Sequence, residues 1–192
     1  MPGPARVLEP ADVRLLLQHV SRHRYPTRNK TIVLLSFKAG LRACEIAGLD
    51  WTMALRPDGR VADHLSISRR IAKMGSARRI PIHPDLAAAL AALNLEQCTP
   101  RKGVVVRSER GGHMTARSIV NWFRDVYADL EYIGCSSHSG RRTFITRSAR
   151  LLSQSGGSLR DVQELAGHRS LTTTELYIQG DREAQRKLVS LV

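Results

Sequence analysis

Cysteine is scarce in this sequence of 192 residues, which contains only Cys44, Cys98 and Cys135. The three residues are odd in number, far apart and without a Cys-x-x-Cys pair, so their spacing predicts neither a disulfide framework nor a zinc site. We interpret them as three reduced thiols.

Long apolar runs are also missing. No stretch reaches the roughly 18 consecutive apolar residues of a membrane-spanning helix. The N-terminus lacks the charged and then apolar order of a signal peptide. We therefore expect an intracellular, soluble protein with no membrane partner.

Acidic residues are in short supply. Asp and Glu number 17 against 30 Lys and Arg, which gives a formal net charge of +13 and a pI near 10.8. Such an excess is typical of proteins that neutralise a polyanion. Nucleic acid is the leading candidate partner. An anionic membrane surface is the competing polyanion, and the missing apolar run and signal peptide count against it.

The length and hydrophobic content of the chain suit a single domain. A hydrophobic content of 42% over 192 residues is enough for a full core in one domain, or one and a half at most. The sequence shows no internal repeat and no low-complexity tract. Apolar residues follow helical spacing over most of the chain and alternate only between Trp51 and Pro84. We therefore predict a mainly α fold with a small antiparallel β-sheet, of the α+β class.

The segment boundaries follow from caps and turn residues. The helices expected with both bounds are Pro10–Val20, Thr31–Lys38, Asp85–Leu95 and His138–Leu152, and Gly40 is expected in a left-handed conformation after the second of them. A short helix should begin near Arg42, and a longer one should be capped by Thr115 and ended by Gly134. Two further helices should begin with capping boxes, formed by Ser158 with Asp161 and by Thr172 with Glu175. The expected strands are His64–Ser68 and Ala77–Ile82, joined by a bend at Met74-Gly75-Ser76, with a further strand edge at Val104–Val106. This assignment puts Lys73 at a hairpin tip, Ser153–Gly157 in a flexible loop, His168 between two helices and Tyr177 on the second of them.

Two pairs of residues are candidate phosphate ligands. His138 and Arg141 are three apart, so on a helix an imidazole and a guanidinium share one face and could share one phosphate. A surface arginine beside a helix-start histidine is the plainer interpretation. Arg42 and Glu45 have the same spacing, which a helical ion pair worth roughly a few tenths of a kcal/mol also explains. Because Arg42 follows Gly40 at a helix start, where anions are favoured, a phosphate site is the alternative there.

Lys73 and Tyr177 carry little information on their own. Lys73 stands in a basic segment and could be one more solvated cation. Its basic neighbours are Arg69, Arg70, Arg78 and Arg79. Tyr177 alone is typical of an amphipathic helix whose hydroxyl lies at the rim.

Together these elements resemble a known family. Ala39-Gly-Leu-Arg42-x-x-Glu45, Lys73 before a strand ending Arg79-Ile-Pro-Ile82, His138-x-x-Arg141, Gly167-His168 and Thr173-Thr-x-x-Tyr177 are similar to the catalytic domain of tyrosine recombinases, the phage integrase family. The similarity runs from about Leu8 to the end, and the spacing from His168 to Tyr177 is its most specific part. The sequence departs from the family at Gly140, Arg142 and Ala166, where Leu, His and Leu are usual, and these changes concern helix packing rather than chemistry.

The resemblance implies a reaction and a role for each residue. The reaction is metal-independent cleavage and rejoining of DNA strands through a covalent 3′-phosphotyrosyl intermediate, without ATP and without a cofactor. The implied catalytic residues are Arg42 and Arg141 as phosphate ligands, His168 as a further hydrogen-bond donor to the phosphate, Tyr177 as nucleophile, His138 as its base and Lys73 as the general acid on the departing 5′ oxygen. Glu45 is expected to support them by orienting its neighbours.

The resemblance also implies an organisation. Residues 1–192 form one catalytic domain with a core of about 8–180 and a tail helix over 181–192, which either docks on a neighbouring subunit or folds back on its own domain. The N-terminal domain of full-length relatives is expected to be absent, because only a few residues precede Leu8. The chain is then either a catalytic fragment or a short recombinase like the fimbrial-switch invertases. The implied partners are double-stranded DNA and other recombinase subunits, as a tetramer on two sites. The implied location is the cytoplasm, on the nucleoid, with a bacterial, phage or mobile-element gene.

Two other functions share these residues. A DNA-binding relative could hold sites without cutting, but the intact catalytic set argues against it. An enzyme similar to type IB topoisomerases could relax DNA by the same chemistry, but the compact size and the Gly167-His168 turn favour a recombinase.

Overall fold

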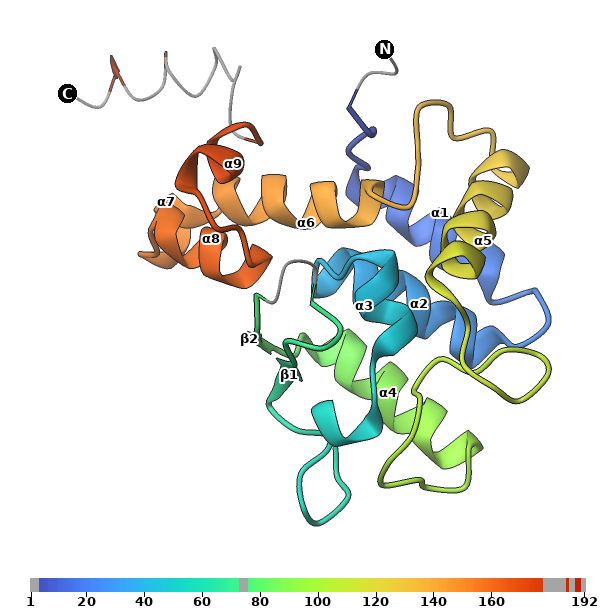
Figure 1. The fold of residues 1–192 in the computed structure, drawn as a ribbon. Helices are drawn as coiled ribbons and strands as arrows, with labels where there is room; N and C mark the ends of the chain where they lie inside the picture. Colours follow the sequence, from blue (N-terminus) through green and yellow to red (C-terminus); the bar gives the residue numbers. More distant parts are fainter. Residues whose placement is uncertain (1–3, 73–75, 178–185, 187–188, 191–192) are drawn as a thin grey trace.

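The structure is a computed structural model that describes residues 4–72, 76–177, 186, 189 and 190 of the chain. This part is mainly helical with a two-stranded antiparallel sheet, which confirms the predicted fold class (Figure 1). None of the helices among the described residues is long and apolar enough to cross a membrane. Lys73, the bend at Met74 and Gly75, and most of the expected tail helix over 181–192 lie outside the described residues.

Short helices dominate the order of elements along the chain. This order is α1 (Pro10–Val20), α2 (Pro26–Lys38), α3 (Ala43–Gly48), the 3₁₀-helix η1 (Trp51–Met53), β1 (His64–Ile67), β2 (Arg78–Pro81), α4 (Pro84–Glu96), α5 (Ala116–Asp129), α6 (Ser139–Arg150), α7 (Leu152–Ser155), α8 (Leu159–Ala166) and α9 (Leu171–Glu175).

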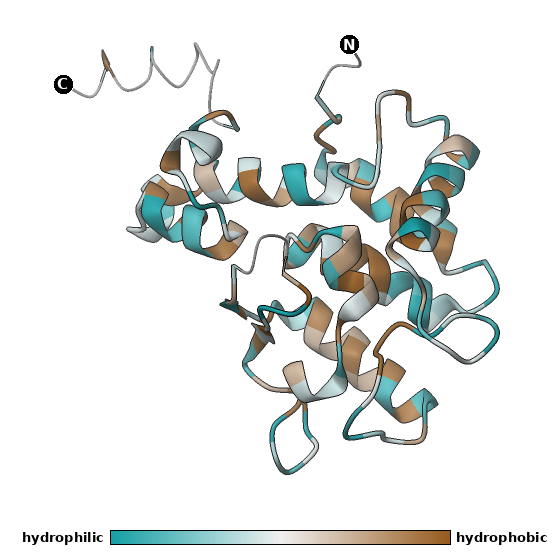
Figure 2. Cartoon of the chain, viewed as in Figure 1, coloured by the Kyte–Doolittle hydropathy of each residue, from teal (hydrophilic) through white to brown (hydrophobic). Residues whose placement is uncertain are grey.

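Helix α2 is the centre of the main body. Every residue from Thr31 to Phe37 is buried, and the helix packs against α1, α3, α4 and α6. Figure 2 shows brown, hydrophobic segments concentrated on α2 and the helices around it. The burial of an almost entirely apolar stretch on all sides explains why its sequence lacks a polar face.

Helices α6 to α9 form a C-terminal lobe with a core of its own. Ile145, Val162 and Ala166 are buried there and are separate from the main cluster, with Tyr177 packed at their edge. The lobe extends from the main body along α6 (Figure 1). Gly140 brings α6 close to α2, because a Cβ at that position would lie 2.9 Å from the Phe37 ring and against Ser36.

The hairpin connects the main body with this lobe. Strands β1 and β2 pair antiparallel, with Leu65 opposite Ile80 and Ser66 opposite Arg79, and β2 also contacts α8. Leu65 and Ile80 are both buried, so one face of the hairpin belongs to the core. Side chains of the hairpin can therefore lie between the main body and the C-terminal lobe.

Several predicted boundaries are confirmed. Helix α1 has the predicted ends, Thr115 accepts a hydrogen bond from the Ser118 backbone N–H as the cap of α5, and Gly40 has a φ of +62°. Ser158 forms the predicted capping box with Asp161 at α8.

Other boundaries were wrong for local reasons. Helix α2 begins at Pro26 rather than Thr31, because a proline in the first turn suits a helix start. Helix α5 ends at Asp129, well before Gly134, and Glu131 takes a positive φ of 55° after it. Val104 forms only an isolated bridge with Asp50 instead of a strand edge.

The end of the described chain also differs from the prediction. Part of the expected flexible loop is helical as α7, and Gly156 follows it in a left-handed conformation. The cap of α9 is Ser170, whose side chain accepts from the Thr172 N–H, rather than Thr172 with Glu175. Because α9 ends at Glu175, Tyr177 lies just beyond the helix instead of on it.

Candidate active site

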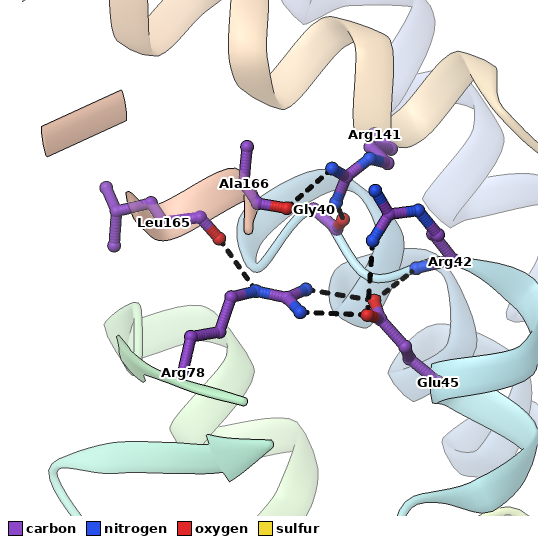
Figure 3. A network of polar contacts seen from close by, with 7 residues as sticks. All are labelled: Gly40, Arg42, Glu45, Arg78, Arg141, Leu165 and Ala166. Atoms are coloured by element: carbon purple, nitrogen blue, oxygen red, sulfur yellow. Dashed lines mark hydrogen bonds and ion pairs between the residues drawn. The ribbon is translucent and has the colours of Figure 1, made fainter. Parts of the chain in front are cut away.

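A buried network of arginines around one carboxylate joins α3, β2 and α8 (Figure 3). Arg42 precedes α3, and its backbone N–H donates to Glu45 Oε2 at 2.9 Å. Arg78 on β2 donates to both carboxylate oxygens of Glu45, at 2.8 and 2.9 Å, and its Nε donates to the Leu165 carbonyl at 2.9 Å. One guanidinium thus ties the hairpin to the main body and to the end of α8.

The Glu45 side chain is fully buried, and the Arg42 guanidinium lies 3.3 Å from its Oε1. Burial alone would raise the pKa of Glu45, but the hydrogen bonds and charge of Arg78 and the backbone bond from Arg42 outweigh it and hold the pKa below its usual range. The ion pair of Arg42 and Glu45 is therefore present, but it is buried and shared with Arg78 rather than exposed on a helix surface.

Arg78 is a site residue, although the sequence indicated only one of several basic neighbours of Lys73. Only 5% of its side chain is exposed. A signal for this burial was present, because strand residues two apart share a face and Ile80, two residues later, is apolar. The neighbouring Arg79 points the other way and is exposed.

Arg141 lies in the first turn of α6, between the main body and the C-terminal lobe. Its guanidinium donates to the carbonyl of Gly40 at 2.7 Å and to the carbonyl of Ala166 at 2.6 Å. The residue is only 3% exposed. The same side chain therefore fixes the turn before α3 against the end of α8.

The network carries more positive than negative charge. Figure 3 shows the guanidinium of Arg42 beside that of Arg141, while Arg42 and Arg78 pair with the single carboxylate of Glu45. Burial first, and then the charge of Arg42, lowers the pKa of Arg141 to about 10. An excess of positive charge at a partly desolvated site favours the binding of an anion, and the planar guanidinium of arginine suits the oxygens of a phosphate.

His168 occupies the turn between α8 and α9, directly after Gly167 with its φ of +64°. Its Nδ1 lies 3.0 Å from the Thr174 hydroxyl. Burial first, and then the charge of Arg141, lowers the pKa of His168 to about 4. The imidazole is therefore neutral at pH 7. If Thr174 donates to Nδ1, the ring proton lies on Nε2 and can be donated elsewhere.

The ring of Tyr177 is held by neighbours of two kinds. It stacks on His168 with 5.6 Å between ring centroids and an angle of 24° between planes. The guanidinium carbon of Arg142 lies 5.7 Å from the Tyr177 centroid, within cation–π range. Arg142, which stands where the family usually has His, is thus in contact with the predicted nucleophile.

A cavity of about 610 Å³ opens beside this tyrosine. Its lining includes Tyr177, Arg141, Arg142 and His138, the last of which is the residue before α6. A second cavity of about 550 Å³ lies at the His168 turn. Its basic lining residues are Arg78, Arg79, Arg160 and Arg169. Arginine side chains thus contribute to the lining of both cavities.

The structure brings most of the predicted site residues into one region. The residues concerned are Arg42, Glu45, His138, Arg141, His168 and Tyr177, drawn from α3, the start of α6 and the turns around α9. Lys73 lies outside the described residues, so its place stays a prediction. The residues that sequence reasoning missed are Arg78, Arg142 and Thr174.

Comparison with known proteins gives a family match over nearly the whole chain. The model of the phage integrase family matches residues 6–184. The tyrosine recombinase XerC of Shewanella amazonensis is 30% identical over 181 residues, which cover 91% of this chain and 56% of that protein. XerC of Myxococcus xanthus is 30% identical over 166 residues, covering 79% of this chain and 50% of that protein. The chain thus spans about half the length of the curated relatives it matches.

Solved structures share the fold. The crystal structure of XerA recombinase superposes with a TM-score of 0.73 at 22% identity, covering 98% of this chain and 65% of that one. The Tn1549 transposon integrase, solved in complex with a circular intermediate DNA, gives a TM-score of 0.72 at 18% identity, covering 99% of this chain and 67% of that one.

Proposed function

The chain belongs to the phage integrase family, and we propose that it cleaves and rejoins DNA strands at specific sites through a covalent 3′-phosphotyrosyl intermediate. One observation carries the proposal: a buried surplus of arginine charge lies next to the tyrosine that lines the larger cavity. Phosphate ligands and a nucleophile are the parts that such a reaction requires.

Fixed cations replace a metal ion in this mechanism. Transfer of a phosphoryl group to tyrosine passes through a five-coordinate phosphorus with added negative charge on its oxygens. Arg42 and Arg141 neutralise that charge, and neutral His168 donates a hydrogen bond from Nε2. Because these groups are held by Glu45 and by backbone carbonyls before DNA arrives, little reorganisation is needed when the charge develops.

Tyr177 is the proposed nucleophile, and the other candidates in the C-terminal half are poorly suited. Burial raises the pKa of Tyr127 and that of Tyr132, and the Tyr132 hydroxyl already donates to the Asp12 carbonyl at 3.0 Å. Since a phenol has an ordinary pKa of about 10, attack needs a base. His138, which lines the same cavity as Tyr177, takes that role in the proposal.

Two further roles complete the reaction. Lys73, which stands between the β1 and β2 segments in the sequence, protonates the departing 5′ oxygen as general acid in this proposal. Glu45 is a positioning residue that orients Arg42 and Arg78. Because the bond energy is kept in the covalent link, another 5′ hydroxyl reverses the step and strands are exchanged without ATP.

The partners follow from the charge and the family. The net charge of +13 suits double-stranded DNA. The Tn1549 integrase was solved in complex with DNA, and a lambda integrase was solved as a dimer bound to a core site.

We place the protein in the cytoplasm, on the nucleoid, and propose a tetramer on two sites, joined by the tail over 181–192. Deletion of that tail then spares single-site binding in gel shifts but abolishes cooperative assembly and recombination. Normal recombination by the truncated chain contradicts the tetramer role.

The decisive experiment traps the covalent adduct. The wild-type chain is incubated with nicked duplexes that carry candidate sites, and the trapped end is sequenced. Tyr177→Phe removes only the hydroxyl, so it retains DNA binding but forms no adduct. Tyr25→Phe is the matched control, because its ring packs under Arg24 and Arg28 rather than beside the cavity, and it forms adduct at the wild-type level.

Other outcomes separate the alternatives. An adduct formed by Tyr177→Phe would place the nucleophile elsewhere. DNA binding without any adduct by the wild-type chain supports the non-cleaving accessory, and relaxation of supercoiled DNA without strand exchange supports a topoisomerase-like activity. Strand exchange between two duplexes is the expected result.

A further inference from the structure

Two histidines and a carboxylate meet at a place that the DNA chemistry does not use. His19 lies in the last turn of α1, His23 follows in the turn after it, and Asp129 is the last residue of α5. One ligand atom from each of the three lies within 4.8 Å of the other two. None of the three residues lines either cavity at the candidate active site.

The contact between His19 and Asp129 does not satisfy the histidine nitrogen. His19 Nε2 is buried and has no hydrogen-bond partner among the described residues, although Asp129 Oδ2 lies 3.5 Å away. A buried nitrogen without a partner lowers stability, so such a group in a native protein calls for an explanation. The histidine rings also approach each other closely, with 4.4 Å between centroids.

The spacing suits a metal ion better than a direct contact. Two ligand atoms bound to a tetrahedral zinc ion at about 2.0–2.1 Å are themselves about 3.4 Å apart. The separation of His19 Nε2 and Asp129 Oδ2, 3.5 Å, is close to that value and long for a charge-assisted hydrogen bond. Imidazole and carboxylate are both ligands that zinc accepts in this geometry.

We propose that His19, His23 and Asp129 form a zinc site that joins the end of α1 to the end of α5, with water in the fourth position. The carboxylate offsets part of the ion's charge, and the chain's net charge of +13 acts weakly there, because charges beyond roughly 8–10 Å are screened by salt. The ion supplies the partner that His19 Nε2 lacks. Its role is structural, since DNA cleavage needs no metal in the mechanism above.

The test is metal binding by the full chain. The protein is treated with EDTA, dialysed and titrated with zinc chloride by calorimetry. We expect one site, and a rise in Tm of about 5 °C or more at free zinc about 100 times the Kd. Bound cobalt should show the visible spectrum of a tetrahedral site with nitrogen and oxygen ligands, without a thiolate charge-transfer band.

Variants locate the ion. His23→Gln and Asp129→Asn should each weaken zinc binding at least tenfold while the Tm without metal stays unchanged. His113→Gln is the matched control, because it removes an exposed histidine away from the cluster and should bind zinc like the wild type. Absence of binding at about 100 µM free zinc overturns the proposal, as does wild-type affinity in both cluster variants or a thiolate band from cobalt.

The DNA assay runs in parallel and is independent of this result. EDTA should lower the Tm of the zinc-loaded chain and leave adduct formation unchanged. Loss of cleavage in EDTA would instead count against the metal-independent reaction, whatever the zinc titration shows.

Discussion

Arg78 and Arg79 are adjacent residues on β2 with opposite environments. The Arg78 side chain is 5% exposed and paired with buried Glu45, whereas Arg79 is exposed. Arg78→Ala leaves the carboxylate buried with only Arg42 beside it, and removal of one partner of a buried pair costs about 3–5 kcal/mol. We expect the lower end of that range in urea unfolding, because Arg42 remains.

The control for this prediction is Arg79→Ala. It removes the same charge from the same strand and should change the free energy of unfolding by less than about 0.5 kcal/mol. Equal losses in the two variants would show that Glu45 does not depend on Arg78.

His168 makes stability depend on pH. Burial and the nearby arginines lower its pKa to about 4 in the folded protein, whereas an unfolded histidine has a pKa of about 6.5. Between these values the unfolded chain binds more protons, so stability falls as pH decreases from 6.5 towards 4 and is fully present above 6.5. Denaturant unfolding across this window should show that slope in the wild type and a flatter one in His168→Gln. Identical slopes contradict the shift.

Packing at the level of elements depends on Gly40, in the connection between α2 and α3. Its φ is +62°, and a Cβ there would lie 2.5 Å from the Phe144 ring on α6. Gly40→Ala therefore adds a steric conflict between elements to the strain of a left-handed residue. We expect a loss of about 3 kcal/mol in the free energy of unfolding.

Gly156 provides the matched substitution. Its φ is +66°, nearly the same, but nothing lies within 4 Å of a Cβ at that position. Gly156→Ala should therefore cost only the conformational strain, about 1 kcal/mol. Equal losses for Gly40→Ala and Gly156→Ala would show that the approach of α6 to the connection contributes nothing.

The charge of the whole molecule predicts how it binds DNA. With 30 basic and 17 acidic residues, phosphate contacts should dominate, and the logarithm of the association constant should fall linearly with the logarithm of salt concentration by about 0.9 per phosphate neutralised. Fluorescence anisotropy with a labelled duplex measures this slope. Arg142→Gln, which changes a residue lining the cavity, should reduce it by about 1. A salt-insensitive complex contradicts the electrostatic account.

Elements with local signals were predictable from the order of residues. Helix α1, the cap at Thr115, the box at Ser158 and the antiparallel hairpin follow from periodicity and from side chains that bond to their own backbone. The spacing of Gly167-His168 and Tyr177 likewise indicated the family without any tertiary contact. Such signals span a few residues, so the chain order contains them.

Tertiary packing sets which charged side chains are buried and which groups they contact. Arg78 and Arg79 have the same side chain, and only the packing of β2 against α3 and α8 makes one a partner of Glu45. The carbonyls that Arg141 binds, at Gly40 and Ala166, lie 101 and 25 residues away. A side chain's surroundings depend on segments distant in the sequence, and periodicity cannot specify which of these segments meet.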